Sequence, residues 1–248
     1  MATEIFSEPL TAIAPPRVFP LVPPLENGDH LTRAEFERRY EAMPQVKKAE
    51  LIQGVVYMAS PVRVNVHGEP HAAVMTWLGL FRAFTPGVRL GDNATLCIDE
   101  DNEPQPDAAL FIDENCGGRS YVSDDGYLTG APELIFEVAA STASYDLREK
   151  LEIYRANGVQ EYAVWSVYNQ RIDWFNLEND NYVRLAADEN GIISSHVFPG
   201  LRLNLNALLT GDLARVINDL QTGLASPEHA AFAQTLANAP NKNPKSKI

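Results

Sequence analysis

The sequence predicts a mixed α/β fold: a central mixed β-sheet flanked by helices, with an added C-terminal β-hairpin and helix. Short apolar runs at about 106–113, 133–140 and 161–167 have the length of buried strands, and a helical pattern at about 146–157 separates the last two. This β-α-β order predicts two parallel strands joined by a right-handed crossover. With 248 residues, 45% of them hydrophobic and 21% charged, the chain fits one globular domain better than two.

Both ends of the chain differ in composition from this core. Residues 1–29 hold six of the seventeen prolines and show no sustained periodicity, so we expect an extended Pro-rich arm there. Residues 30–225 form the expected domain. The end at 226–248 contains Asn, Pro and Lys and is expected to be a flexible tail.

Local signals predict the other elements. Thr32 and Glu35 make a capping box before a weak apolar stripe, which indicates a helix at about 32–43. Two apolar runs within 49–58 flank Gln53-Gly54, which is typical of a hairpin turn. The remaining expected elements are a helix at about 69–84, a strand at about 94–99, a hairpin at 171–177 and 182–186, a candidate third strand beside it at 192–197, and an amphipathic helix within Leu201–Leu224.

The charge and cysteine content narrow the classes of function. The net charge of -13 and the pI near 4.8 argue against tight, nonspecific binding to DNA or membranes, although a local basic patch, a metal ion or an oligomeric groove could still bind phosphate. No apolar run reaches the roughly 18 residues of a membrane span, and the first residues lack a basic leader, so we expect a cytoplasmic protein without membrane association. Cys97 and Cys116 have no spacing typical of zinc or of a disulfide framework, and we expect ordinary buried thiols.

Two carboxylates interrupt apolar strands. Glu137 lies in the otherwise apolar run 134–140, and Asp107 follows Pro106 at the mouth of another strand. A buried carboxylate needs a compensating partner, and two of them could share one divalent cation. Mg²⁺ suits such a site, with Mn²⁺ as the alternative, because it takes hard oxygen ligands and often only one or two protein carboxylates. The simpler alternatives are that Asp107 merely begins a strand and that Glu137 pairs with a neighbouring cation.

The helix that follows Glu137 carries a candidate partner. Asp146 is a good N-cap, and Leu147, Leu151 and Tyr154 share one helical face. Lys150 falls about 60° from the centre of that face, because successive helical residues rotate by about 100°. Its stem can lie along the sheet while its ammonium group reaches the carboxylates. Alternatively, Lys150 is an ordinary lysine at the boundary of an amphipathic helix.

Several short segments together resemble one known family. They are Ala49 through Gly54, Pro106-Asp107, Phe136 through Val138, Asp146 through Lys150, and Gly158 through Tyr162. Over about residues 32–205 they resemble, in the expected order, the bacterial Uma-type putative restriction endonucleases of the PD-(D/E)xK nuclease superfamily. The resemblance implies a restriction-endonuclease-like core, with Asp107 and Glu137 as metal ligands.

The resemblance also implies roles for three further residues. The lysine expected two residues after the acid is replaced by Ala139, which implies a migrated lysine supplied by Lys150. Glu50 matches an early family glutamate that would complete the metal site, and His71 matches a family histidine that would contact phosphate. Alternatively, Glu50 is a solvated strand residue and His71 simply caps or packs. The link at 139–142 is one residue shorter than is usual in the family.

The sequence therefore predicts a metal-dependent endonuclease that hydrolyses phosphodiester bonds with a metal-activated water. DNA is preferred over RNA as the expected substrate, although no residue decides between them. A homodimer is expected if both strands are cut together. The alternative is a catalytically silent nuclease-fold protein that serves as a protein-interaction module, which would suit the acidic surface better. A serine hydrolase has little support, because no serine lies in a Gly-x-Ser-x-Gly turn.

Overall fold

A six-stranded mixed sheet forms the centre of the computed structural model, which describes residues 22–58, 62–140 and 146–239. Its strands, in spatial order, are β11 (Asn181–Arg184), β10 (Arg171–Glu178), β9 (Glu161–Ser166), β8 (Leu134–Ala139), β5 (Ala108–Ile112) and β3 (Val88–Asp92). β8 and β9 are parallel, and the other neighbours are antiparallel. The mixed α/β fold and the hairpin at the end of the sheet are confirmed.

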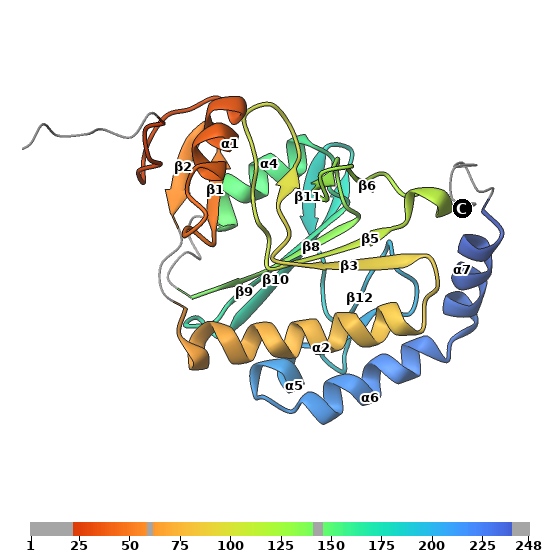
Figure 1. Cartoon of the computed structure of the whole chain (residues 1–248). Helices are drawn as coiled ribbons and strands as arrows, with labels where there is room; N and C mark the ends of the chain where they lie inside the picture. Colours follow the sequence, from red (N-terminus) through yellow and green to blue (C-terminus); the bar gives the residue numbers. More distant parts are fainter. Residues whose placement is uncertain (1–21, 59–61, 141–145, 240–248) are drawn as a thin grey trace, which may run out of the picture.

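Each face of the sheet packs against a different layer (Figure 1). On one face, Phe136 and Val138 of β8 pack with Trp77 of helix α2 (Glu69–Ala83) and with helix α6 (Leu213–Leu224). On the other face, Ile135 and Ala139 pack with helix α4 (Leu151–Ala156). Because side chains alternate along a strand, Glu137 shares the α4 face with Ile135 and Ala139. A single π-type turn (Asp146–Lys150) precedes α4, so the expected helix is confirmed with a wider first turn.

A small unit built from helix α1 (Arg33–Glu41) and a hairpin lies beside the α4 face (Figure 1). Thr32 caps α1 by accepting from the Glu35 backbone N–H at 3.4 Å, as the capping box predicted. The hairpin consists of β1 (Ala49–Ile52) and β2 (Val55–Met58). Its turn residues Gln53 and Gly54 have φ values of 51° and 73°, the left-handed conformation that a tight two-residue turn needs.

Sequence reasoning missed one strand and described two others incorrectly. The missed strand is the edge strand β3, whose sequence Val-Arg-Leu-Gly-Asp alternates too weakly to be recognised. The strand expected at 94–99 is only β4 (Leu96–Cys97), which belongs to a separate sheet with β7 (Leu128–Thr129) and β6 (Tyr121–Val122). The candidate third strand of the hairpin is β12 (Ile192–Ser194), which pairs instead with β13 (Arg202–Asn204).

The C-terminal region is more ordered than the sequence indicated. After β13, the chain forms α5 (Leu205–Leu209), α6, and then α7 (Pro227–Ala237) inside the stretch expected to be a flexible tail. Leu236 of α7 is 4% exposed, and its His229 hydrogen bonds with Thr85 at 2.9 Å. This tertiary burial explains the difference, because local sequence carries no sign of it. Most of the expected Pro-rich arm lies outside the described residues.

The other short turns are a π-type turn at Val64–Gly68 and a 3₁₀ turn at Glu114–Cys116. Among the described residues, no helix combines the length and apolarity needed to cross a bilayer.

Candidate functional site

The register of the sheet places Asp107 opposite Glu137. β5 and β8 pair Ala108 with Phe136 in antiparallel register, so the preceding residue of one strand faces the following residue of the other. Each carboxylate accepts a hydrogen bond from a backbone N–H of the other strand: Val138 N donates to Asp107 Oδ2 at 2.8 Å, and Asp107 N donates to Glu137 Oε2 at 3.4 Å. Both residues are 3% exposed. Their side chains thus meet on the α4 face of the sheet.

Lys150 joins two carboxylates from different parts of the chain. Its ammonium Nζ lies 2.9 Å from Glu137 Oε1 and 2.9 Å from Glu50 Oε1. Lys150 is 3% exposed, and it lies at the end of the turn that leads into α4. Lys150 therefore lies beside Glu137, where the migrated-lysine hypothesis would place it, and its role as the replacement for the lysine absent at Ala139 stays a prediction.

Glu50 is a buried member of this cluster. It lies on β1 and is 9% exposed, and its Oε1 also accepts from Gln105 N at 2.7 Å. Burial opposes the ionisation of Glu50, but the charges of Lys150 and Lys48 and the hydrogen bond from Gln105 outweigh it and hold the pKa below its ordinary value. The alternative of a solvated strand residue is therefore wrong for Glu50.

Tyr154 of α4 adds a neutral hydrogen bond to the same cluster. Its hydroxyl donates to Glu137 Oε1 at 3.2 Å, and its ring is fully buried. Lys150 and Tyr154 are four residues apart, which places both on the side of the helical segment that faces the sheet. The helix therefore supplies Glu137 with one charged donor and one uncharged donor.

The other side of Asp107 faces basic groups. Asp107 Oδ1 lies 3.5 Å from Lys48 Nζ and 3.5 Å from His67 Nε2. His67 also contacts the Val138 carbonyl through Nδ1 at 2.9 Å and stacks on the ring of His71, with centroids 5.8 Å apart. These groups form a basic edge beside an otherwise acidic cluster.

His71 lies at the border of the site rather than at its centre. Its Nε2 is 3.1 Å from the Asp107 backbone carbonyl and 3.2 Å from Asp92 Oδ1. Its contact with phosphate stays a prediction. Sequence reasoning missed His67, although its spacing of four residues from His71 could have found it. It also missed Lys48, although the two-residue period of β1 places it on the same side as Glu50.

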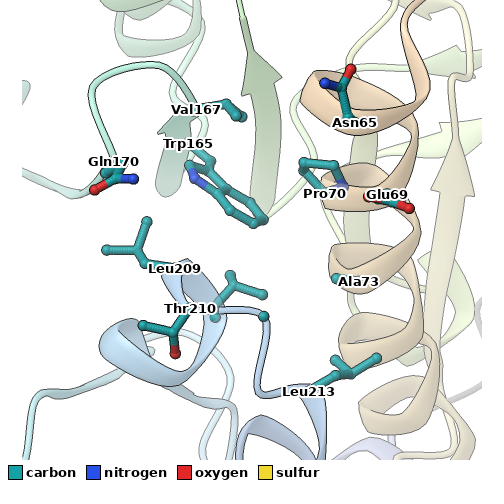
Figure 2. A pocket seen from close by; sticks show the side chains of 12 residues that line it. Asn65, Glu69, Pro70, Ala73, Trp165, Val167, Gln170, Leu209, Thr210 and Leu213 are labelled. Atoms are coloured by element: carbon teal, nitrogen blue, oxygen red, sulfur yellow. The ribbon is translucent and has the colours of Figure 1, made fainter.

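A pocket of about 500 Å³ lies on another part of the surface (Figure 2). It is lined mainly by apolar side chains of α2, β9 and α5 to α6, including Trp165, Pro70 and Leu209. None of the four clustered residues Glu50, Asp107, Glu137 and Lys150 lines it. The polar cluster at the sheet and this pocket are therefore separate features of the structure.

Comparison with known proteins gives the family of the chain. A family model described as Uma2, putative restriction endonuclease, matches residues 33–206. The chain belongs to the Uma2 family. The resemblance seen in the sequence is thereby confirmed, and the Uma2 match includes every residue of the cluster. A search of curated proteins gave no match.

A solved structure supports the Uma2 fold. The chain is similar to a putative nuclease belonging to DUF820 from Anabaena variabilis, with a TM-score of 0.52 and 13% sequence identity. The match covers 70% of this chain and 96% of that one. At this identity the likeness shows the fold alone, whereas the Uma2 membership supports a nuclease that acts on nucleic acid.

The donor set of the Uma2 chain fits a hard divalent cation. Asp107 and Glu137 offer carboxylate oxygens, the ligands that Mg²⁺ and Mn²⁺ prefer. Asp107 Oδ2 is held by a 2.8 Å hydrogen bond, whereas Oδ1 makes longer contacts of 3.5 Å with Lys48 and His67. Asp107 Oδ1 is therefore the oxygen best placed to exchange its present neighbours for a cation.

Proposed function

We propose that this chain is a divalent-metal-dependent endonuclease that hydrolyses phosphodiester bonds, with DNA preferred over RNA. The observation that carries the proposal is the buried cluster in which Asp107 and Glu137 interlock and Lys150 lies 2.9 Å from Glu137. Two strand carboxylates beside one lysine are the chemical groups that phosphodiester hydrolysis needs.

Asp107 and Glu137 would hold the cation, which is Mg²⁺ or Mn²⁺ in this proposal. When bound, such a cation supplies Lewis-acid chemistry: it offsets charge on the phosphate and favours ionisation of water. The backbone hydrogen bond from Val138 fixes the Asp107 carboxylate in place. Lys150 holds Glu137 and Glu50 together and reduces their mutual repulsion, and its charge helps to keep the pKa of Glu50 low although Glu50 is buried.

Hydrolysis forms one bond from phosphorus to the water oxygen and breaks the bond to the leaving sugar oxygen, which takes up a proton. Negative charge grows on the phosphate oxygens during this step, and fixed positive groups stabilise it. Lys150 supplies such a charge at the buried end of the cluster. Lys48 and His67 lie at the other end, beside Asp107, where they can offset the charge of the nucleic-acid backbone. His71 would contact phosphate at the border of the site.

The Asp107→Asn substitution tests the proposal, because it removes a ligand charge while keeping the shape of the side chain. We expect wild type to cleave DNA with Mg²⁺ or Mn²⁺, and we expect the variant to lose about 100-fold or more of this activity, the scale on which removal of one charge-stabilising group acts. The exposed Asp124 gives a matched control, since Asp124→Asn should leave cleavage and the unfolding midpoint unchanged.

Purified wild type that cleaves neither DNA nor RNA, single- or double-stranded, with either metal would overturn the nuclease proposal and favour the non-catalytic interaction module.

We also propose a homodimer, because two sites are needed to cut both strands of a duplex. Light scattering on the purified chain measures its mass, and a monomer that still makes double-strand breaks in one encounter would contradict this part.

A further inference from the structure

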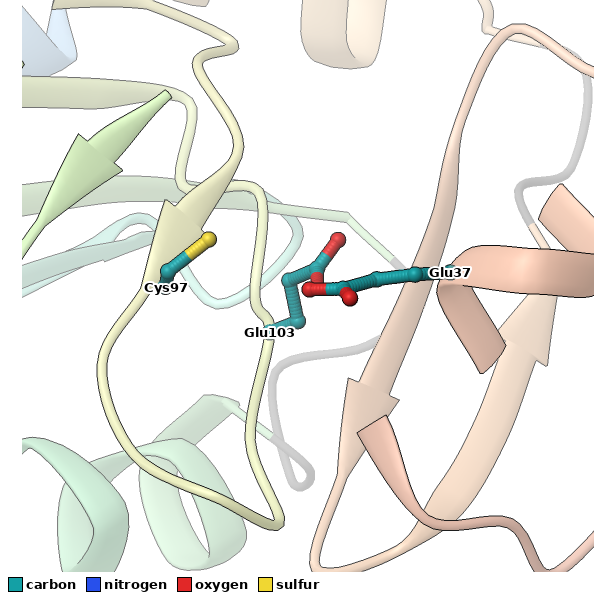
Figure 3. A group of neighbouring side chains, drawn as sticks. All are labelled: Glu37, Cys97 and Glu103. Atoms are coloured by element: carbon teal, nitrogen blue, oxygen red, sulfur yellow. The ribbon is translucent and has the colours of Figure 1, made fainter. Parts of the chain in front are cut away.

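A second group of potential metal ligands lies outside the proposed nuclease site. Glu37 of α1, Cys97 of β4 and Glu103 of the loop after β4 each offer one ligand atom, and these atoms all lie within 4.8 Å of one another. Figure 3 shows the Cys97 sulfur of β4 and the Glu103 carboxylate of the following loop turned toward the Glu37 carboxylate of α1. Cys97 and Glu103 are six residues apart, whereas Glu37 joins them only in the folded chain.

Glu103 gives an independent sign that a ligand is missing. It is 4% exposed, and its Oε2 has no hydrogen-bond partner among the described residues. A buried carboxylate oxygen without a partner is costly, and each such atom requires an explanation. The backbone of Glu103 is fixed, because it exchanges two hydrogen bonds with Leu51 of β1, of 2.7 and 3.2 Å. The side chain is therefore held toward Glu37 and Cys97.

The group brings two carboxyl groups and one thiol together, and all three can bind a metal ion as anions. Arg33 offsets part of the negative charge, with its Nε 3.1 Å from Glu37 Oε1. A divalent ion would displace the protons of the thiol and the carboxyl group and would supply the partner that Glu103 Oε2 lacks.

We propose that Glu37, Cys97 and Glu103 bind a divalent transition-metal ion of the Zn²⁺ class. One thiolate and two carboxylates are ligands that Zn²⁺ accepts, whereas the sulfur disfavours Mg²⁺. Tetrahedral coordination with bonds of about 2.0–2.3 Å places ligand atoms roughly 3.5 Å apart, so the three side chains need to close by about an ångström or a little more. Water completes the coordination on the solvent side, where Glu37 is partly exposed.

The bound ion would link α1 to the region of β4 and its following loop, which are about 60 residues apart in the chain. It ties α1 to β4 and to the loop that runs on through Gln105, the residue whose backbone N–H binds Glu50. The site is nevertheless separate from the proposed nuclease site. Glu103 pairs with the backbone of Leu51, whereas the side chain of Glu50, the preceding residue of β1, points to the opposite side of the strand from that of Leu51. The inference goes beyond the proposed function, and its test does not depend on nuclease activity.

Cobalt titration of the full chain tests the site, because Co²⁺ bound to a thiolate gives a sulfur-to-cobalt charge-transfer band that oxygen ligands do not give. The titration is done with a non-thiol reductant and with excess Mg²⁺ to occupy hard-oxygen sites. We expect one equivalent of Co²⁺ to produce the band in wild type and Zn²⁺ to remove it. Cys97→Ser should abolish the band, and the matched control Cys116→Ser should retain it.

Absence of the band in wild type, or its persistence in Cys97→Ser, would overturn the proposal. A second variant keeps the test decisive if Cys97→Ser fails to fold. Glu37→Gln alters a partly exposed residue on a helix and keeps the thiol. Isothermal titration with Zn²⁺ should show an affinity loss of about 10-fold or more in Glu37→Gln, on the scale seen when groups that support a metal are removed. An unchanged affinity in this variant would equally overturn the proposal.

Discussion

Replacing Lys150 by Met removes the positive charge at the centre of the carboxylate cluster while keeping most of the buried volume. Lys150 Nζ lies 2.9 Å from both Glu50 Oε1 and Glu137 Oε1, and all three residues are buried. The substitution leaves two carboxylates facing one another without the ammonium group that compensates them. Water cannot easily replace it, because the Lys150 side chain is only 4% exposed.

The expected cost follows from this burial. Removing one partner of a buried ion pair destabilises a protein by about 3–5 kcal/mol, because an uncompensated charge remains. For a chain of this size, such a loss lowers the thermal midpoint by roughly 6–20 °C at neutral pH. Lys47 offers a matched control, since it is an exposed lysine nearby. Lys47→Met should change the free energy of unfolding by less than about 0.5 kcal/mol.

The penalty in Lys150→Met should depend on pH. In wild type the Glu50 pKa is lowered despite burial, so ionised Glu50 contributes stability above its unfolded value of 4.5, and this stability is lost as the pH falls through the folded value. In the variant the Lys150 charge no longer opposes burial, so the Glu50 pKa rises and the carboxyl group binds a proton more readily. The difference in stability between the two proteins should therefore be largest near pH 7 and should shrink as the pH falls below 4.5.

Urea unfolding followed by tryptophan fluorescence at several pH values measures this difference. A double variant, Lys150→Met with Glu50→Gln, should recover part of the loss at pH 7, because it removes one of the two unpaired charges. The reasoning would be refuted if Lys150→Met cost less than about 1 kcal/mol at pH 7, or if the cost did not change with pH.

Two further predictions concern packing and hydrogen bonding. Gly223→Ala in α6 should destabilise the chain by about 1–3 kcal/mol, because a Cβ there would lie 2.2 Å from the Gly200 carbonyl oxygen; Gly79→Ala in α2, where a Cβ meets nothing within 4 Å, should stabilise it by about 0.4–1 kcal/mol. Equal effects in thermal unfolding would contradict the packing argument. Tyr154→Phe should cost about 1.5–3 kcal/mol, the value of a hydrogen bond to a charged group, because Glu137 loses a donor. Denaturant midpoints check this value, and a neutral result would show that Glu137 does not need that donor.

The sequence predicted that two strand carboxylates would come together, and the alternation of side chains explains how they meet in the structure. Asp107 is an even number of residues from Ala109 and Phe111, and Glu137 is two residues from Ile135, so in each strand these side chains point to the same side. These apolar residues all pack on the α4 face, so the carboxylates had to lie on that face as well. The helical position of Lys150 predicted its approach to the same face for a similar reason.

The fold was less predictable where burial depends on distant segments. The pattern of β3 is weak, yet β3 pairs with β5. The Ser226 cap, Pro227 and the Ala-rich run of α7 indicate a helix locally, but the burial of Leu236 in the core depends on distant segments. β12 likewise had the composition of a strand, but its partner was set by the return of β13 rather than by the hairpin that precedes it. Propensity describes single segments, whereas pairing is decided by packing among segments.

The sequence by itself determined the elements that carry Asp107, Glu137 and Lys150, and it placed Lys150 beside the apolar face of its helix. Periodicity is a local property, and it survives without knowledge of the partner segment. Only the tertiary structure decided that Glu50 would share Lys150 with Glu137, and that Glu37 and Glu103 would converge on Cys97. Each grouping brings in one residue that is far away in the chain, Glu50 or Glu37, and its position follows from how β1 and α1 pack beside the sheet.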